Sequence, residues 1–300
     1  MTHFSMIGLI GHLHNERATY SLKRLIRFLQ ARNVQFVLEQ STAELLKNDP
    51  MFNAARQVKD IDALGKICDL VIVVGGDGSL LRGARGLAKY HVPLLGVNRG
   101  RLGFLTDIMP EDIEVKVAEV LSGKYTLEER FLLDISIKRN DEIVESSEAL
   151  NEAVLHPGQF VHMLQYEIYV DGDFVTTQSS DGIIVSTPTG STAYSLSGGG
   201  PLMHPKLDAI VLVPMNPHTL SSRPMVVTGD SQIMIRVGEH SRALPMISCD
   251  GHTHFEMCLG DEIHIAKKPD LLKLLHPEDY NFYDRCRTKL GWGGTLLDTE

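Results

Sequence analysis

The stretch VIVVGGDGSLL, from Val71 to Leu81, is the part of the chain from which the rest is interpreted. Its first four residues are apolar and β-branched, which is typical of a strand that is covered on both faces. A glycine-rich turn, Gly75 to Gly78, follows with Asp77 at its tip, and glycine tolerates positive φ and close approach of the backbone to a ligand. Ser79 is predicted to cap a helix whose apolar residues recur at helical spacing.

A strand, a glycine turn and a helix N-terminus together favour an anion site, because free N–H groups and the helix dipole point at one spot. The turn has neither the lysine of the GxxxxGK[ST] motif nor the spacing of GxGxxG. Asp77 would repel a phosphate there, unless a metal ion bridges the two or the carboxylate takes part in the reaction. The alternative for this turn on its own is an ordinary tight turn with a solvated aspartate.

Composition restricts the class of protein. A length of 300 residues favours two domains, and the net charge of −9 argues against non-specific binding to nucleic acid or to an anionic membrane. The four cysteines are scattered without a CxxC pair, which argues against a disulfide framework. No apolar run reaches the length of a membrane span, and the first segment does not resemble a signal peptide. These features predict a soluble cytoplasmic protein.

Residues 1–124 read as an α/β domain. Strands are expected at Met6 to Ile10, Val34 to Leu38 and Pro93 to Val97, in addition to the strand before the glycine turn, with helical patterns between them. This alternation predicts an open, mostly parallel sheet that binds ligands at the carboxyl ends of its strands, where Asp77 falls.

Residues 125–270 show strands and turns with almost no helical pattern, which predicts an antiparallel β-sandwich-like domain. The clearest hairpin joins Val161 to Val170 with Phe174-Val175 across the turn Asp171-Gly172. The remaining segment, 271–300, includes a helical pattern between Pro277 and Leu290 and is expected to pack back on the N-terminal domain.

Polar groups that could hold a ligand interrupt the apolar strands of the second half. Asn151-Glu152 could hold a ribose diol, since the amide donates and accepts while the carboxylate accepts a hydroxyl proton; an edge strand with two solvated groups is the alternative. Asp181 precedes a buried strand, and the following stretch from Thr187 to Tyr194 supplies hydroxyl and N–H donors and an aromatic face. The run Ser197 to Pro201 is glycine-rich and predicts a backbone that approaches another part of the protein closely.

A cluster of Cys249, His252, His254 and Cys258 could in principle bind zinc, but its spacing fits no usual zinc pattern. Cys249-Asp250-Gly251 reads better as the end of a strand and a turn. We therefore predict no metal site formed by protein side chains alone.

The order of the motifs resembles that of the NAD kinases, particularly the bacterial ones, which share a superfamily with diacylglycerol kinases and phosphofructokinases. The resemblance rests on GGDG at 75–78, NRGRLGFLT at 98–106, NE at 151–152, SDG at 180–182, TPTGSTAYSLSGGGP at 187–201 and SRP at 222–224. GGDG alone occurs in other kinases, whereas its combination with NE and TPTGSTAY is specific to this family.

The resemblance implies ATP-dependent phosphorylation of the adenosine-ribose 2′-hydroxyl of NAD, giving NADP and ADP, with a divalent cation, most suitably Mg²⁺, held by the ATP phosphates. It implies an active site between an α/β and a β domain, in a homo-oligomer (a dimer or tetramer) that binds neither nucleic acid nor membrane. Asp77 would be the general base or would orient the 2′-hydroxyl. Phosphate binding would fall to Gly75, Gly76 and Gly78. The implied NAD-binding residues are Asp77, Gly78, Phe104, Asn151, Glu152, Asp181, Thr189, Ser191, Thr192, Ala193 and Tyr194. Arg223 lies in a matching motif without an assigned role.

Two other functions remain open from the residues alone. The first is a lipid or sugar kinase of the same superfold, although no amphipathic segment suggests docking to a membrane. The second is a dinucleotide-binding regulator in which Asp77 is structural, and such a protein would bind NAD without consuming ATP.

Overall fold

The computed structural model describes residues 4–11, 16–46, 58–99, 103–158, 163–238 and 245–292. The chain divides into two compact units, Met1–Glu129 with Leu272–Glu300 (unit 1) and Arg130–Leu271 (unit 2). Residues 100–102 of the motif at 98–106, and 161–162 of the expected strand Val161 to Val170, lie outside the described residues.

Unit 1 contains a parallel sheet in the order β17-β5-β4-β1-β2-β3. Its strands are β1 (Met6–Gly11), β2 (Gln35–Glu39), β3 (Val58–Lys59), β4 (Leu70–Val74), β5 (Leu94–Val97) and the end of β17 (Glu262–Pro277). All five residues of β4 are buried, as the run of β-branched residues predicts. The prediction of an open parallel sheet is confirmed.

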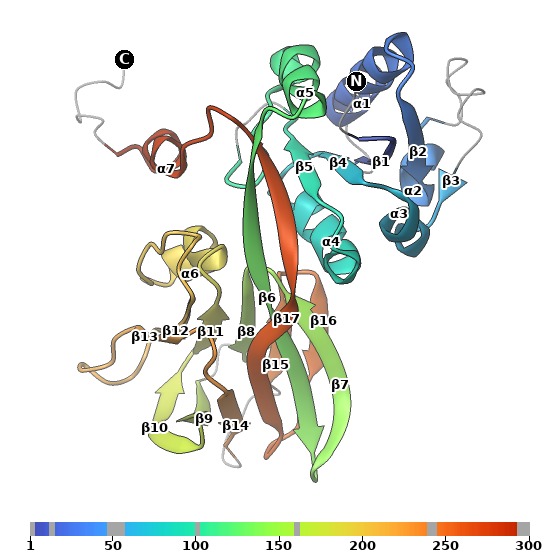
Figure 1. Cartoon of the computed structure of the whole chain (residues 1–300). Coiled ribbons are helices and arrows are strands. Elements are labelled where there is room, and N and C mark those ends of the chain that lie inside the picture. Colours follow the sequence, from blue (N-terminus) through green and yellow to red (C-terminus); the bar gives the residue numbers. More distant parts are fainter. Residues whose placement is uncertain are drawn as a thin grey trace. The chain divides into compact units, whose positions relative to one another are not determined.

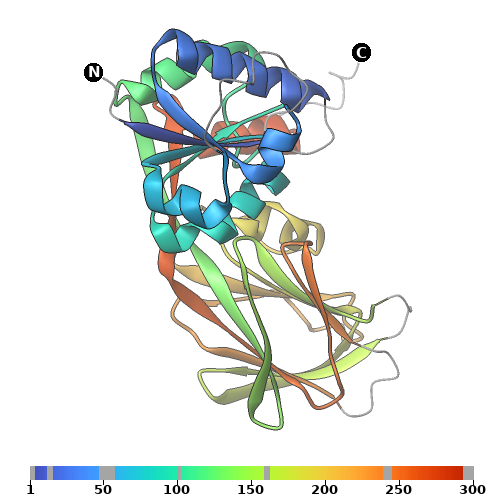
Figure 2. The ribbon, with the colours of Figure 1, turned by 90° about the vertical axis from the view of Figure 1, so that its right-hand side faces the viewer.

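Helices cover both faces of this sheet (Figure 1, Figure 2). They are α1 (Glu16–Ala31), α2 (Gln40–Glu44), α3 (Ile61–Ile67), α4 (Asp77–Leu87) and α5 (Ile113–Leu121); a further helix, α7 (Phe282–Leu290), follows β17 along the chain. Apolar residues of α1 and α5 share one core with the strands, and α3 packs with α4. Short 3₁₀ turns, Ala88–Tyr90 and Pro110–Asp112, follow α4 and precede α5. The C-terminal helix begins at Phe282 and not at the expected Pro277, because Asn281 is its N-cap and accepts hydrogen bonds from the Tyr283 and Asp284 N–H groups.

The glycine turn differs from its prediction in two respects. The helix α4 begins at Asp77 with Gly76 as its N-cap, and Ser79 lies buried inside the helix instead of capping it. None of the glycines at 75, 76 and 78 adopts a positive φ; Gly76 has φ −99°. The turn is therefore a direct strand-to-helix connection in ordinary backbone conformations. Glycine is useful here because it has no side chain that would keep a ligand away from the backbone.

Unit 2 is a sandwich of two sheets, as predicted. One sheet has the order β13-β12-β11-β8-β15-β16, and the other contains β10-β9-β14-β17, with β6 pairing β17 and β7. The strands are β6 (Tyr125–Arg139), β7 (Glu142–Ala149), β8 (Glu152–His156), β9 (Leu164–Val170), β10 (Asp173–Ser180), β11 (Gly182–Ser186), β12 (Ala209–Met215), β13 (Met225–Thr228), β14 (Ile233–Val237), β15 (Met246–Cys249) and β16 (Thr253–Glu256). Side chains from both sheets form one core, which includes Leu155, Tyr166, Ile183 and Ile235.

Two local predictions in unit 2 can be checked directly. The hairpin between β9 and β10 turns at Asp171 and Gly172, both of which have positive φ, so the two-residue turn is confirmed. The edge-strand alternative for the Asn151-Glu152 motif is wrong, because β8 pairs with β11 on one side and with β15 on the other. The chain passes between the two units along β6 and β17.

Candidate functional site

The Asp77 carboxylate in unit 1 is held by the loop that follows β5. Its Oδ2 accepts a hydrogen bond from the Phe104 N–H at 2.8 Å. Its Oδ1 accepts from the Leu105 N–H at 3.2 Å and from the Thr106 hydroxyl at 3.0 Å. The aspartate is half-buried and lies in the first turn of α4. Asp77 and Phe104, which were predicted as separate parts of one site, are therefore in direct contact within unit 1.

Two glycines make this arrangement possible. A Cβ at Gly103 would lie 2.0 Å from the Asp77 Oδ1, and a Cβ at Gly96 would lie 2.6 Å from the Leu105 carbonyl oxygen. Thr106 is fixed in turn by the Asn98 Nδ2, which donates to its Oγ1 at 2.8 Å. The motif at 98–106 thus supplies both the donors that hold the carboxylate and the space into which it fits.

The N–H groups of the turn are not equally available to a phosphate. Gly75 donates its N–H to the Val97 carbonyl at 2.9 Å, so this group is engaged by β5. The Gly76 carbonyl accepts from the Ser79 and Leu80 N–H groups, which form the first hydrogen bonds inside α4. The N–H groups that precede Ser79 therefore have no acceptor within the helix. Gly78 is exposed. The N–H groups that remain available to an anion are therefore those of the first turn of α4.

The Asn151-Glu152 motif in unit 2 is fixed by a carboxylate that the sequence did not identify as functional. The buried Asp250 accepts hydrogen bonds from the N–H groups of Leu150, Asn151 and Glu152, at 2.9, 2.8 and 3.2 Å. Asp250 has φ 50° and ends β15 in a turn with Gly251, which confirms the predicted turn. No pattern in the sequence links two segments about 100 residues apart, so its contact with the motif could only be found in the structure.

Both side chains of the motif contain a buried oxygen that lacks a protein donor. Among the described residues, no group hydrogen-bonds to the Asn151 Oδ1 or to the Glu152 Oε2. Burial, followed by the nearby charge of Asp250, raises the pKa of Glu152 to about 8, and a hydrogen bond from the Tyr194 N–H opposes this shift. Leaving a buried acceptor unsatisfied costs about 1–3 kcal/mol, so such a pair is typical of a ligand site.

The stretch Thr187 to Tyr194 folds against this motif. The Thr187 N–H donates to the Asn151 carbonyl at 2.9 Å, and a Cβ at Gly190 would lie only 2.3 Å from the same oxygen. Gly190–Thr192 forms a 3₁₀ turn, followed by the short helix α6 (Tyr194–Ser197). The structure thus brings the Asn151-Glu152 motif and the Thr187 to Tyr194 stretch together.

Other residues of the stretch make mostly internal contacts. The Ser191 hydroxyl donates to the Pro188 carbonyl at 2.7 Å, and Thr192 bonds to the Thr189 carbonyl at 3.3 Å. Thr189 is buried and accepts from Arg130 at 3.3 Å. Ala193 is half-buried, whereas Tyr194 presents half of its surface to solvent, with 50% exposure. Ser191 thus fixes the turn, and Tyr194 presents the aromatic face.

The run Ser197 to Pro201 approaches its surroundings closely, as predicted. A Cβ at Gly200 would lie 2.5 Å from the Ser195 hydroxyl oxygen, and one at Gly198 would lie 3.1 Å from Ile184. Gly199 has φ +84°, which a side chain would strain.

Asp181 lies apart from the other predicted residues of unit 2. It precedes the first residue of β11, whereas Ser186, the last residue of that strand, pairs with Glu152. The five residue steps from Asp181 to Ser186, at about 3.3 Å each, put these two residues about 16 Å apart. The Asp181 carboxylate instead accepts a hydrogen bond from the Asn216 Nδ2 at 2.8 Å. Within unit 2, Asp181 is therefore not part of the group around Asn151.

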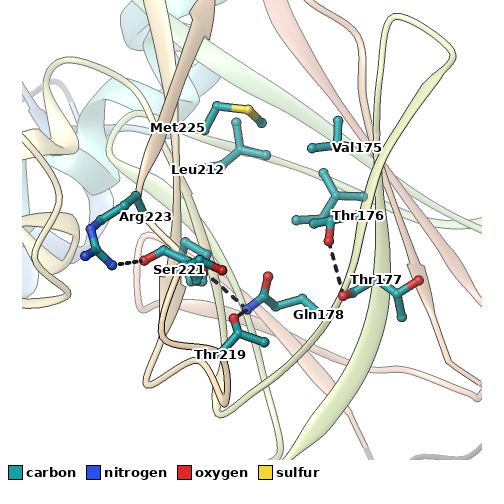
Figure 3. A pocket seen from close by; sticks show the side chains of 12 residues that line it. Val175, Thr176, Thr177, Gln178, Leu212, Thr219, Ser221, Arg223 and Met225 are labelled. Carbon is teal, nitrogen blue, oxygen red and sulfur yellow. Dashed lines mark hydrogen bonds between the residues drawn. The ribbon is translucent and has the colours of Figure 1, made fainter.

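Arg223 holds its own loop. Its guanidinium donates to the Leu220 and Ser222 carbonyls at 3.1 and 2.7 Å. The loop borders a pocket of about 280 Å³ in unit 2, shown in Figure 3. Gln178, Thr219 and Ser222 form long hydrogen bonds of 3.4–3.5 Å at this pocket. These contacts give Arg223 a local structural role.

The residues that the structure describes contain no group of three His, Cys, Asp or Glu side chains placed to hold a metal ion. All four cysteines are free thiols, and within the described part of the chain no helix has the length and hydropathy of a membrane span.

Comparison with known proteins decides the family. The family model for the ATP-NAD kinase N-terminal domain matches residues 7–125, and the model for the ATP-NAD kinase C-terminal domain matches residues 150–276. The chain belongs to the NAD kinase family. It is therefore an enzyme, a kinase, as the resemblance predicted.

Relatives and solved structures agree with this assignment. The NAD kinase of Cellvibrio japonicus is 70% identical over the whole of both chains, and that of Azotobacter vinelandii is 54% identical over 99% of both. Yeast NADH kinase complexed with NADH superposes with a TM-score of 0.87 at 27% identity, covering 99% of this chain and 90% of that one. An NAD kinase from Archaeoglobus fulgidus in complex with ATP gives a TM-score of 0.70 at 25% identity, covering 95% of this chain and 96% of that one. The fold is thus the fold of the family.

Proposed function

We propose that the enzyme transfers the terminal phosphoryl group of ATP to the 2′-hydroxyl of the adenosine ribose of NAD, which gives NADP and ADP. The family assignment and the NADH and ATP complexes of the two solved relatives support this reaction. The observation that carries it is the pair of buried acceptors, the Asn151 Oδ1 and the Glu152 Oε2, for which the described residues provide no donor. A ribose presents two adjacent hydroxyls, which can donate to the Asn151 oxygen and either donate to or accept from the Glu152 carboxyl group.

Asp77 is the residue that we propose to act on the 2′-hydroxyl. A carboxylate has about four lone-pair positions. Three of them accept hydrogen bonds from Phe104, Leu105 and Thr106, and two of these three bonds end on Oδ1. Oδ2 therefore keeps one position for the substrate hydroxyl, and Asp77 would orient this group and receive its proton as the bond to phosphorus forms.

The remaining residues bind substrates in this proposal. The N–H groups at the beginning of α4, with Gly76 and Gly78, would bind phosphate oxygens of ATP. Tyr194, Thr189, Ser191, Thr192 and Ala193 would line the NAD site beside Asn151, and Phe104 would lie beside the adenine. Asp181 remains a proposed NAD contact, although within unit 2 it lies at the other end of β11.

A divalent cation, most suitably Mg²⁺, would be bound by the phosphates of ATP, since the described residues offer no protein-only set of ligands for one. When bound, such an ion neutralises the charge that develops on the transferred group. We further propose a homo-oligomer in the cytoplasm, where free cysteines such as Cys68 and Cys286 stay reduced.

The direct test is to incubate the purified enzyme with ATP, Mg²⁺ and NAD and to measure NADP with an NADP-specific dehydrogenase. NADP formation that requires both ATP and NAD is the expected result. If no NADP forms while NAD still raises the melting temperature, the chain is a dinucleotide-binding regulator and the proposal is wrong. Replacing NAD by a sugar or a diacylglycerol tests the alternative kinase substrates in the same assay.

A further inference from the structure

A buried cluster of ionisable side chains in unit 1 lies beside the loop that holds Asp77. The His276 Nδ1 contacts the Asp107 Oδ2, and the His276 Nε2 lies 3.5 Å from the Glu128 Oε2. The Arg285 Nε lies 3.5 Å from the other oxygen of Asp107. The side chains of His276 and Asp107 are each 1% exposed, and that of Glu128 is 7% exposed. Burying ionisable groups is costly unless they are paired and hydrogen-bonded, so this cluster calls for an explanation.

The cluster is continuous with the loop through Asp107. This residue directly follows Thr106, whose hydroxyl donates to the Asp77 Oδ1. The Asp107 and Ile108 N–H groups donate to the Gly96 carbonyl at 3.2 and 3.3 Å, and the Asn98 N–H donates to the Ile108 carbonyl at 2.7 Å. The backbone of the loop is thus hydrogen-bonded to β5. On its other side, the Asp107 side chain attaches the loop to His276.

His276 is well placed to act as that second attachment. Leu275 pairs with Leu95 in the parallel β17–β5 ladder, so His276 follows beside Gly96, the residue that receives the loop. The Tyr280 N–H donates to the Pro277 carbonyl at 2.9 Å. The Tyr280 ring then stacks on the imidazole, with ring centroids 3.9 Å apart and an interplanar angle of 15°. This packing leaves the ring little freedom to turn.

We propose that His276 is a positioning residue: by holding Asp107, it fixes the loop whose donors aim the Asp77 carboxylate. The proposal rests on the role of Asp77 given under the proposed function. A shift of about 1 Å in a catalytic group lowers turnover by up to about 100-fold, even when the mutated residue lies outside the site. Loosening the loop should therefore lower kcat more than it weakens NAD binding, because Phe104 is the one proposed adenine contact in the loop and most of the other proposed NAD contacts lie in unit 2.

Two substitutions of similar size separate positioning from mere stability. The amide nitrogen of asparagine can occupy the place of Nδ1, whereas that of glutamine can occupy the place of Nε2. His276→Asn thus keeps a donor for Asp107, and His276→Gln keeps one for Glu128 instead. Both remove the stacked ring, so both should lower the melting temperature by similar amounts. We expect kcat to fall about 10- to 100-fold in His276→Gln and no more than about threefold in His276→Asn, with the KM for NAD within about twofold of wild type in both.

The control is Asp279→Asn. Asp279 lies in the same C-terminal segment and pairs with Lys116 of α5 at 2.9 Å, but it does not contact Asp107. This variant loosens the segment alone and should keep kcat unchanged. Equal kcat values for the two His276 variants, or losses that follow melting temperature across all three variants, would overturn the proposal.

If a His276 variant does not fold, Arg285→Gln replaces it. This substitution removes the guanidinium from Asp107 at the more exposed side of the cluster, where the Arg285 side chain is 18% exposed. A fall in kcat with unchanged KM for NAD supports positioning through Asp107, and unchanged kcat contradicts it. Asp77→Asn separates a failure of the proposed function from a failure of the positioning role. If that variant retains wild-type kcat, the proposed role of Asp77 itself is wrong, whatever the His276 variants show.

Discussion

The two groups of candidate site residues, one within each unit, differ in how their carboxyl groups are satisfied. In unit 1, Asp77 accepts three hydrogen bonds from its own protein and is held in one orientation. In unit 2, Glu152 is buried with one oxygen that no described residue satisfies, and its pKa is raised to about 8. The first carboxylate is organised before any substrate arrives, whereas the second requires a partner. A group that reacts gains from the first arrangement, and a group that binds gains from the second.

The largest expected effect follows from removing the charge of Asp77. In Asp77→Asn the amide cannot accept the proton of a ribose hydroxyl, so we expect kcat to fall by about 10²- to 10⁴-fold. The fold and the Kd for NAD should change little, since the asparagine side chain has nearly the same shape and can still form a hydrogen bond with the ribose hydroxyl. Steady-state kinetics and NAD titration by calorimetry measure the two quantities. A variant with near-normal kcat would remove Asp77 from the reaction.

The second prediction concerns binding. Asn151→Ala removes the buried Oδ1 while keeping the backbone bonds of Asn151 to Thr187 and to Asp250. The loss of one hydrogen bond to substrate, about 0.5–1.5 kcal/mol, should raise the Kd for NAD up to about 10-fold with a smaller change in kcat. Titration of NAD in the absence of ATP measures it. An unchanged Kd would contradict the contrast between a binding half and a reacting half.

The sequence predicted most elements of this comparison but not the contacts that produce it. The parallel sheet and the β-sandwich follow from local patterns, and they are confirmed. Only the family resemblance implied that Asn151 and the Thr187 to Tyr194 stretch belong together, and in the structure the Thr187 N–H donates to the Asn151 carbonyl. The start of α4 was misplaced, because a serine after a glycine turn is a common cap and the competing start at Asp77 leaves no signature. Asp250 could not be predicted at all as a support of the motif, since its three bonds connect segments that are distant in sequence.

The third prediction uses the raised pKa of Glu152. Its folded-state pKa lies above its ordinary value of 4.5, so the folded protein binds this proton more tightly than the unfolded chain does. Its contribution to stability is therefore complete below about pH 4.5 and is lost as the pH rises towards about 8. The slope is at most about 1.4 kcal/mol per pH unit.

Glu152→Gln removes this titration while keeping the shape of the side chain. Between pH 5 and pH 8, the free energy of unfolding of the wild type should therefore fall relative to that of the variant. The difference, variant minus wild type, should grow as the pH rises. Chemical denaturation at several pH values measures the difference. Parallel stability curves for the two proteins would mean that Glu152 titrates normally and that its oxygen is solvated.

The smallest effect is expected from Thr106→Val, which keeps the shape of the side chain and removes one of the three donors to Asp77. Oδ2 keeps its bond from Phe104 and Oδ1 keeps its bond from Leu105, so the carboxylate should stay close to its position, and kcat should fall by only about 2- to 10-fold. The KM for NAD should not change. This variant calibrates the first prediction: if Thr106→Val lowers kcat as much as Asp77→Asn does, then both report the order of the loop and not the chemistry of the carboxylate. A large gap between them means that the charge of Asp77 acts on the substrate itself, because the two substitutions disturb the same loop.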